Sequence, residues 1–183
     1  MLHYIYCRPL GIIILFMVLI LGIWSILPSF IPKKRWKFGN LVLGLLMVTA
    51  ILYATVFIRS ENETEPVLVP FASFAAAKQQ PELYREMLMN VFLFFPMGLT
   101  LSNALPCRWR MSERITVTVL VGCMLSVGIE FIQYRFALGT AETDDVICNT
   151  LGTFVGTLSL IVSYFLKRAV QSAKDAKKGS KKL

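Results

Sequence analysis

Five long apolar runs dominate this sequence, and each is close to the length that a helix needs to cross a membrane. The runs cover residues 10–27, 38–58, 88–105, 115–136 and 146–166. A helix rises ~1.5 Å per residue, so about 20 residues cross a hydrocarbon core of ~30 Å. The stretches between the runs are too short for a separate soluble domain. The sequence therefore predicts an all-α, polytopic bundle of about five transmembrane helices, formed as a single domain by residues 1–166.

The composition agrees with a membrane protein and disagrees with a soluble one. Of the 183 residues, 56% are hydrophobic and 16% are charged. A soluble domain usually has about 45–50% apolar and about 25% charged residues. Pro28 and a basic cluster, rather than a small-residue cleavage site, follow the first run. That run is therefore predicted to be a retained helix and not a signal peptide.

The charged residues predict how the chain is oriented. Basic residues flank the runs in alternate connections, at Lys33, Lys34, Arg35 and Lys37, then Arg108, Arg110 and Arg114, then Lys167, Arg168, Lys174, Lys177, Lys178, Lys181 and Lys182. Basic connections stay on the cytoplasmic side, and with five spans all three groups fall on one side. We therefore expect a multi-pass protein of the plasma membrane, with the N-terminus outside and the C-terminus cytoplasmic.

The same distribution bears on partners. The net charge of +8 arises from short segments beside the apolar runs, which favours membrane lipids as partners and gives no support for nucleic acid. Residues 167–183 are predicted to form a disordered basic cytoplasmic tail. Between the second and third runs, residues 67–77 are apolar but too short to cross. This outer segment is predicted to be re-entrant or interfacial.

Polar side chains inside the predicted spans are the candidate functional residues, because burying them in lipid is costly. Glu130 and Gln133 share one helix face in the fourth run, and Asp145 and Asn149 share one in the fifth. Asn90 lies in the first turn of the third run, near its outer end. The predicted ligand-binding residues, all in the outer half of the bilayer, are Arg59, Asn90, Glu130, Gln133, Arg135, Asp145 and Asn149.

Each of these residues also has a purely structural interpretation. Glu130 would then pair with Arg135 or Arg59, and Asp145 would cap the fifth helix. Amide side chains such as Asn149 would make interhelical hydrogen bonds. We expect structural roles for a second set, in which one residue kinks a helix and small residues permit close packing: Pro96, Gly98, Gly152 and Gly156.

The sequence offers few routes to catalysis. It contains no nucleotide-binding, hydrolase or zinc-protease motif, and the lone histidine, His3, precedes the first run. Any acid–base chemistry would use Glu130, Asp145 or Asp144, and of these Glu130 and Asp145 are the two catalytic candidates. The cysteines have neither a CxxC pair nor metal-ligand spacing. No cofactor and no metal are expected.

The motifs resemble those of the VanZ-like membrane protein family, whose founding member is associated with teicoplanin resistance. The similarity covers residues 68–166, including "LVPFASF", "REMLMNVFLFFPMGLTL" and "SVGIEFIQYRFALGTAETDDVICNTLGTFVG". Within these segments the spacing N–x5–P–x–G, then E–x2–Q, then D–x3–N–x2–G is fairly specific. Glu142 stands where the family often has Asp, so the charge is kept and the reach changes.

The resemblance implies a protein of the bacterial cell envelope that affects susceptibility to glycopeptide and lipoglycopeptide antibiotics. Its outer polar site would bind an envelope lipid, a lipid-linked precursor or a peptidoglycan-related ligand. Two alternatives stay open: an intramembrane enzyme acting on a lipid-linked substrate, and a membrane scaffold for a protein partner. Non-enzymatic action is the preferred hypothesis.

Overall fold

A computed structural model describes the backbone of residues 2–58 and 65–180 and the side chains of residues 10–58 and 65–175. The elements in chain order are α1 (Leu2–Ile26), the 3-10 turn η1 (Leu27–Ser29), α2 (Lys33–Leu52), the π-helical turn η2 (Tyr53–Phe57), α3 (Ala72–Ala76), α4 (Glu82–Ala104), α5 (Met111–Phe136) and α6 (Thr143–Ser180). Five helical segments are long and apolar enough to cross a membrane. The predicted all-α bundle with five spans is confirmed.

The distribution of side chains suits a lipid environment. Large apolar residues such as Ile12, Leu45 and Met124 are exposed, whereas small polar residues such as Ser126 and Thr153 are buried. A bundle in lipid gains nothing by hiding its apolar surface, so interiors of this kind collect small and polar residues. The chain is a membrane protein that packs around a polar-containing interior.

Helices α4 and α6 form the centre of the bundle and touch through their backbones. An added Cβ on Gly98 would overlap the carbonyl oxygen of Thr153, and one on Gly152 would overlap that of Val91. Gly156 meets the Phe95 carbonyl in the same way. These three glycines have the packing role that their spacing predicted. Pro96 lies inside α4, which is helical throughout from Glu82 to Ala104, so the kink stays a prediction.

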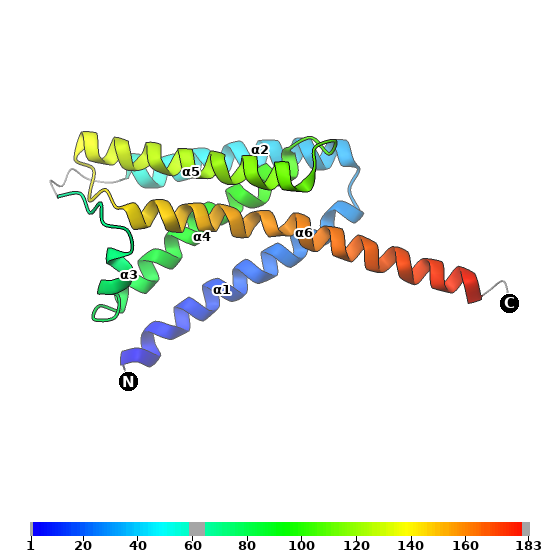
Figure 1. Cartoon of the computed structure of the whole chain (residues 1–183), viewed down its shortest axis with the longest axis horizontal. Coiled ribbons are helices and arrows are strands. Elements are labelled where there is room, and N and C mark those ends of the chain that lie inside the picture. The colour runs from blue at the N-terminus through cyan, green and yellow to red at the C-terminus, as the bar shows by residue number, and fades with distance from the viewer. Residues whose placement is uncertain (1, 59–64, 181–183) are drawn as a thin grey trace.

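The two ends of the bundle differ in character (Figure 1). The α1–α2 and α4–α5 connections lie at one end, which we call the basic end because residues 33–37 and 108–114 supply its Lys and Arg side chains. Helix α3 and the α5–α6 connection lie at the other, which we call the α3 end. The alternation of charge along the sequence thus becomes a separation of charge in space.

The C-terminal tail differs from its prediction. Helix α6 continues past the bundle as an extended arm to Ser180 (Figure 1), so the predicted disorder is wrong for residues 167–180. This segment contains Ala, Lys and Gln, which have high helix propensity, and it prolongs a helix that has already nucleated. The Gln171 side chain also donates to Asp175 one turn later, at 3.0 Å.

The apolar segment before α4 packs on the α5–α6 connection rather than crossing the bundle. Val67 exchanges two backbone hydrogen bonds with this connection, donating to the Ala141 carbonyl and accepting from the Thr143 N–H. Phe71, which precedes α3, has a left-handed backbone with φ 64°. A non-glycine residue adopts this conformation at a cost and needs surrounding contacts to hold it.

Candidate functional site

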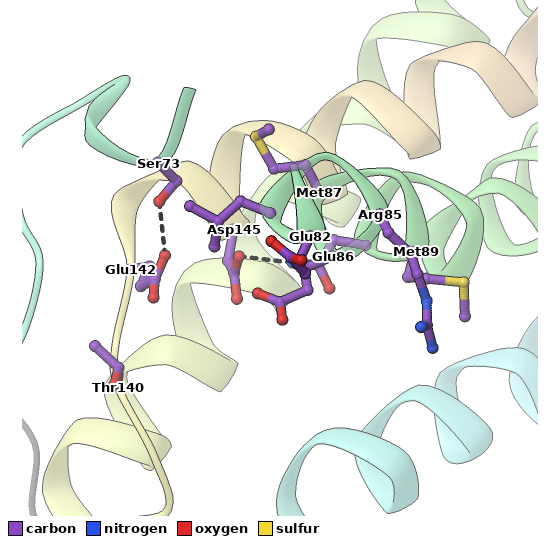
Figure 2. Close-up of a pocket in the computed structure, with 11 residues that line it drawn as sticks. Ser73, Glu82, Arg85, Glu86, Met87, Met89, Thr140, Glu142 and Asp145 are labelled. Carbon is purple, nitrogen blue, oxygen red and sulfur yellow. Dashed lines mark hydrogen bonds between the residues drawn. The ribbon is translucent and has the colours of Figure 1, made fainter. Parts of the chain in front are cut away.

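A cavity of about 510 Å³ opens at the α3 end of the bundle. Its walls come from α3, the first turns of α4, the α5–α6 connection and the start of α6 (Figure 2). The lining residues are Ser73, Glu82, Leu83, Arg85, Glu86, Met87, Met89, Asn90, Thr140, Glu142 and Asp145. Two of the predicted ligand-binding residues, Asn90 and Asp145, are among them.

Asn90 and Asp145 join the two central helices at the cavity wall. The Asn90 Nδ2 donates to Asp145 Oδ1 at 2.6 Å (Figure 2). Close approach of α4 and α6 at Gly152 and Val91 brings the two helix starts within reach of each other. Asp145 lies in the first turn of α6, where the helix dipole favours a negative charge. The sequence analysis assigned both residues to the outer half of the bilayer without pairing them, and the structure brings them into contact.

The cavity is acidic. Glu82, Glu86, Glu142 and Asp145 contribute four carboxylates, whereas Arg85 is the one basic residue in the described lining. In Figure 2 the Arg85 side chain points away from the group that Glu82 and Glu86 form with Asp145. Such a wall attracts cationic groups and repels phosphates. An ammonium-bearing ligand fits this site better than the anionic headgroup of a phospholipid.

Asp144 holds the outer segment in place and does not line the cavity. Its side chain is buried, and its two oxygens accept the backbone N–H groups of Phe71 at 2.6 Å and Ser73 at 2.7 Å. A carboxylate from α6 thus satisfies the orphan N–H groups at the start of α3. The Ser73 hydroxyl also donates to Glu142 Oε2, at 2.9 Å. Asp144 therefore fixes the α3 side of the cavity.

Glu130 contacts the α5–α6 connection from outside the cavity. Its Oε2 accepts the backbone N–H of Glu142 at 2.9 Å, and the residue is not part of the lining. This contact orients the α5–α6 connection and, through it, the Glu142 side chain. Of the two catalytic candidates, only Asp145 faces the space where a ligand would sit.

Gln133 turns to a different neighbour from Glu130, although the two are three residues apart on α5. The buried Gln133 side chain donates its Nε2 to the Thr55 carbonyl, at 2.9 Å. Thr55 belongs to η2, a wider π-helical turn in which backbone carbonyls lose their usual partners. Gln133 therefore attaches the end of α2 to α5 and takes no part in the cavity.

The remaining predicted residues do not meet at the cavity. Asn149 is buried between helices and donates to the Ser126 hydroxyl at 2.9 Å, one turn deeper along α6 than Asp145. Arg135 is exposed near the end of α5. Arg59 lies outside the described residues. Six of the seven predicted residues are therefore described, and they separate into the cavity pair, Glu130 outside the lining, two interhelical contacts and an exposed arginine.

Several cavity residues were missed by the sequence analysis, namely Ser73, Glu82, Arg85, Thr140 and Glu142 as lining residues. An exposed acid in the first turn of a helix is common because it complements the helix dipole, so Glu82 gave no distinct signal. The acidic residues just before the predicted third and fifth runs were the available clue. Within the described parts of the chain, no three His, Cys, Asp or Glu side chains are grouped to hold a metal ion.

Comparison with known proteins identifies the family of this chain. The family model described as VanZ/LLP1 matches residues 13–166, which include all five spans and the cavity. The chain belongs to the VanZ/LLP1 family. Over 73 residues it is 38% identical to Protein VanZ of Enterococcus faecium, a match that covers 40% of this chain and 42% of that protein. No solved structure matches the chain. The expected VanZ-like membership is confirmed.

Proposed function

We propose that this VanZ/LLP1 protein lowers the susceptibility of the cell to glycopeptide and lipoglycopeptide antibiotics by binding an envelope ligand in its acidic cavity. The cavity end would face outward and the basic end inward, as the positive-inside bias predicts. Antibiotics of this class act outside the membrane, so an outward cavity lies on the correct side. The resemblance to the VanZ family supports the antibiotic role.

The observation that carries the proposal is the hydrogen-bonded Asn90–Asp145 pair in a wall with four carboxylates. Pairing with Asn90 holds the Asp145 carboxylate in one orientation. An ionised carboxylate has about four lone-pair sites, so it can accept more than one hydrogen bond. A ligand that carries an amine would gain charge-assisted hydrogen bonds there. This favours an amine-bearing peptidoglycan-related ligand, or an aminated envelope lipid, over an unsubstituted phospholipid.

The test is the substitution Asp145→Asn, assayed as teicoplanin susceptibility in a strain that the wild-type protein protects. Asparagine keeps the shape of Asp145 but removes its charge, so we expect at least a tenfold loss of ligand affinity, equivalent to about 1.4 kcal/mol, and loss of protection. Asp175→Asn is the matched control, because it makes the same change in the exposed arm of α6. Full protection by Asp145→Asn, at equal protein levels in the membrane, would contradict the proposal.

The carboxylates that line the cavity also favour a second candidate, an enzyme acting on a lipid-linked envelope substrate. Asp145 would be its general base, because it faces the cavity and Glu130 does not. This candidate predicts a change in extracted envelope lipids on expression of the wild type that is absent with Asp145→Asn. Identical lipid profiles with and without the wild-type protein would exclude it and leave the binding proposal standing.

A further inference from the structure

A second cavity, of about 280 Å³, lies at the basic end of the bundle, far along the helices from the acidic one. Its lining comes mainly from the start of α2, the α4–α5 connection and α6. Four basic residues line it: Lys33, Lys37, Arg114 and Lys167. From the sequence, these charges indicated the orientation of the chain and a general attraction to membrane lipids.

The charge of this cavity is uniform. No Asp or Glu is among its described lining residues. Glu113, the acid closest in sequence, accepts the backbone N–H of Arg110 at 2.9 Å as part of a capping box at the start of α5. Four positive charges around one small space repel one another, and an anion that enters the space relieves this repulsion.

Arg114 is held in a fixed orientation at the cavity wall. Its Nε and Nη2 both donate to the Ser102 carbonyl, at 3.1 Å and 2.7 Å. A guanidinium has five N–H groups, so these bonds set its plane and leave other donors for a ligand. The neighbouring Asn103 is already committed, because it accepts from Trp36 Nε1 at 3.3 Å and donates to the Leu99 carbonyl and the Ser159 hydroxyl.

The rest of the lining is aromatic and apolar. Trp36, Trp109 and Tyr164 contribute rings, and Ile31 and Leu160 contribute aliphatic surface. Tryptophan and tyrosine concentrate where the hydrocarbon core meets the headgroups, and basic pockets between transmembrane helices bind anionic headgroups. A free phosphate ion would use the lysines and Arg114 but gain nothing from this apolar surface.

We propose that this cavity binds the phosphate group of an anionic phospholipid, with Arg114 as the fixed ligand and Lys33, Lys37 and Lys167 closing around the headgroup. Long, flexible lysine side chains can reach the phosphate while their methylene stems lie along Trp36 and Trp109. The site is independent of the acidic cavity and of the proposed antibiotic role.

The experiment uses the full chain in lipid nanodiscs that contain equal amounts of phosphatidylglycerol and phosphatidylcholine, with native mass spectrometry to count retained lipid. We expect the wild type to retain phosphatidylglycerol selectively. The double variant Lys37→Gln/Lys167→Gln should bind it about 30-fold more weakly, from the contribution expected of two basic residues. The matched control is Lys34→Gln/Arg168→Gln. It removes two exposed charges that are next in sequence to Lys33 and Lys167 but do not line the cavity, so it should keep the selectivity for phosphatidylglycerol.

Two results would overturn the proposal as a defined site. Equal losses in both double variants would indicate general attraction to the basic surface, and no loss in either would show that the cavity holds no anionic lipid. A third arm separates the sources of phosphate. Millimolar inorganic phosphate should not displace the retained lipid, and displacement by it would assign the cavity to a soluble phosphate compound instead.

Discussion

Asp144 shows how one buried carboxylate can determine the shape of a site that it does not touch. It joins the first turn of α6 to the start of α3 through two backbone N–H groups, and the strained Phe71 is one of the donors. Charge-assisted hydrogen bonds to a buried carboxylate are stronger than neutral ones. The α3 side of the cavity therefore depends on Asp144, which does not itself line the cavity.

We predict that Asp144→Asn releases this segment and lowers the free energy of unfolding by about 1–3 kcal/mol. Asparagine offers one acceptor oxygen for two N–H donors, and its own amide would face the second donor. Trypsin cleavage after the exposed Lys78, followed by mass spectrometry, should become faster than in the wild type. Glu82→Gln, an equivalent change at an exposed position, should leave the cleavage rate unaltered. Unchanged cleavage in Asp144→Asn would contradict the assigned role.

Residue patterns grouped the polar side chains but did not predict their contacts. Asn90 and Asp145 belonged to one predicted outer group, and they form a hydrogen bond with each other. Glu130 and Gln133 were placed on one helix face, yet they contact the Glu142 backbone and the Thr55 carbonyl respectively. Three residues on a helix differ in direction by roughly 60°, which suffices to reach different neighbours. The π-helical turn that receives Gln133 has no signature in the local sequence, so this partner was not predictable.

At the scale of elements, the contact between α4 and α6 depends on missing side chains. Gly98 and Gly152 each face a backbone carbonyl of the opposite helix, whereas a Cβ on Gly128 of α5 would have nothing within 4 Å. The same substitution at these positions therefore tests packing against helix propensity.

We predict that Gly98→Ala and Gly152→Ala each destabilise the bundle by roughly 3 kcal/mol or more, because a methyl group must displace backbone rather than a flexible side chain. Gly128→Ala should be neutral or more stable by about 0.5–1 kcal/mol. Thermal unfolding of the purified proteins in one detergent measures both effects. Equal midpoints for all three variants would show that the helices do not approach as closely as described.

The helical elements themselves were largely predictable, because apolar runs of about 20 residues permit little else in a membrane. The arm of α6 was not, since its Lys and Ser content resembles that of disordered tails. Helix propensity and continuity with the preceding span outweigh that composition for residues 167–180.

At the scale of the whole molecule, we expect a bundle of five spans to have its basic end and its α3 end on opposite sides of the membrane. We predict that the α3 end is outside. In a background with the other cysteines changed to alanine, a membrane-impermeant maleimide should label Lys78→Cys in intact cells. It should label the exposed Cys107 only after the cells are permeabilised. The reverse pattern would invert the orientation and place the acidic cavity in the cytoplasm.

The glycine contacts also limit how the acidic cavity can change shape. Helices α4 and α6 pack backbone to backbone and cannot slide or rotate against each other without first separating. The cavity wall that contains Asn90 and Asp145 should therefore be rigid. A bulky ligand would then have to enter past the opposite rim, where the Asp144 carboxylate and the Ser73–Glu142 hydrogen bond hold the start of α3. In the proposed binding role, the rigid α4–α6 wall would determine which ligand is selected, and movement of the α3 rim would determine whether it can enter.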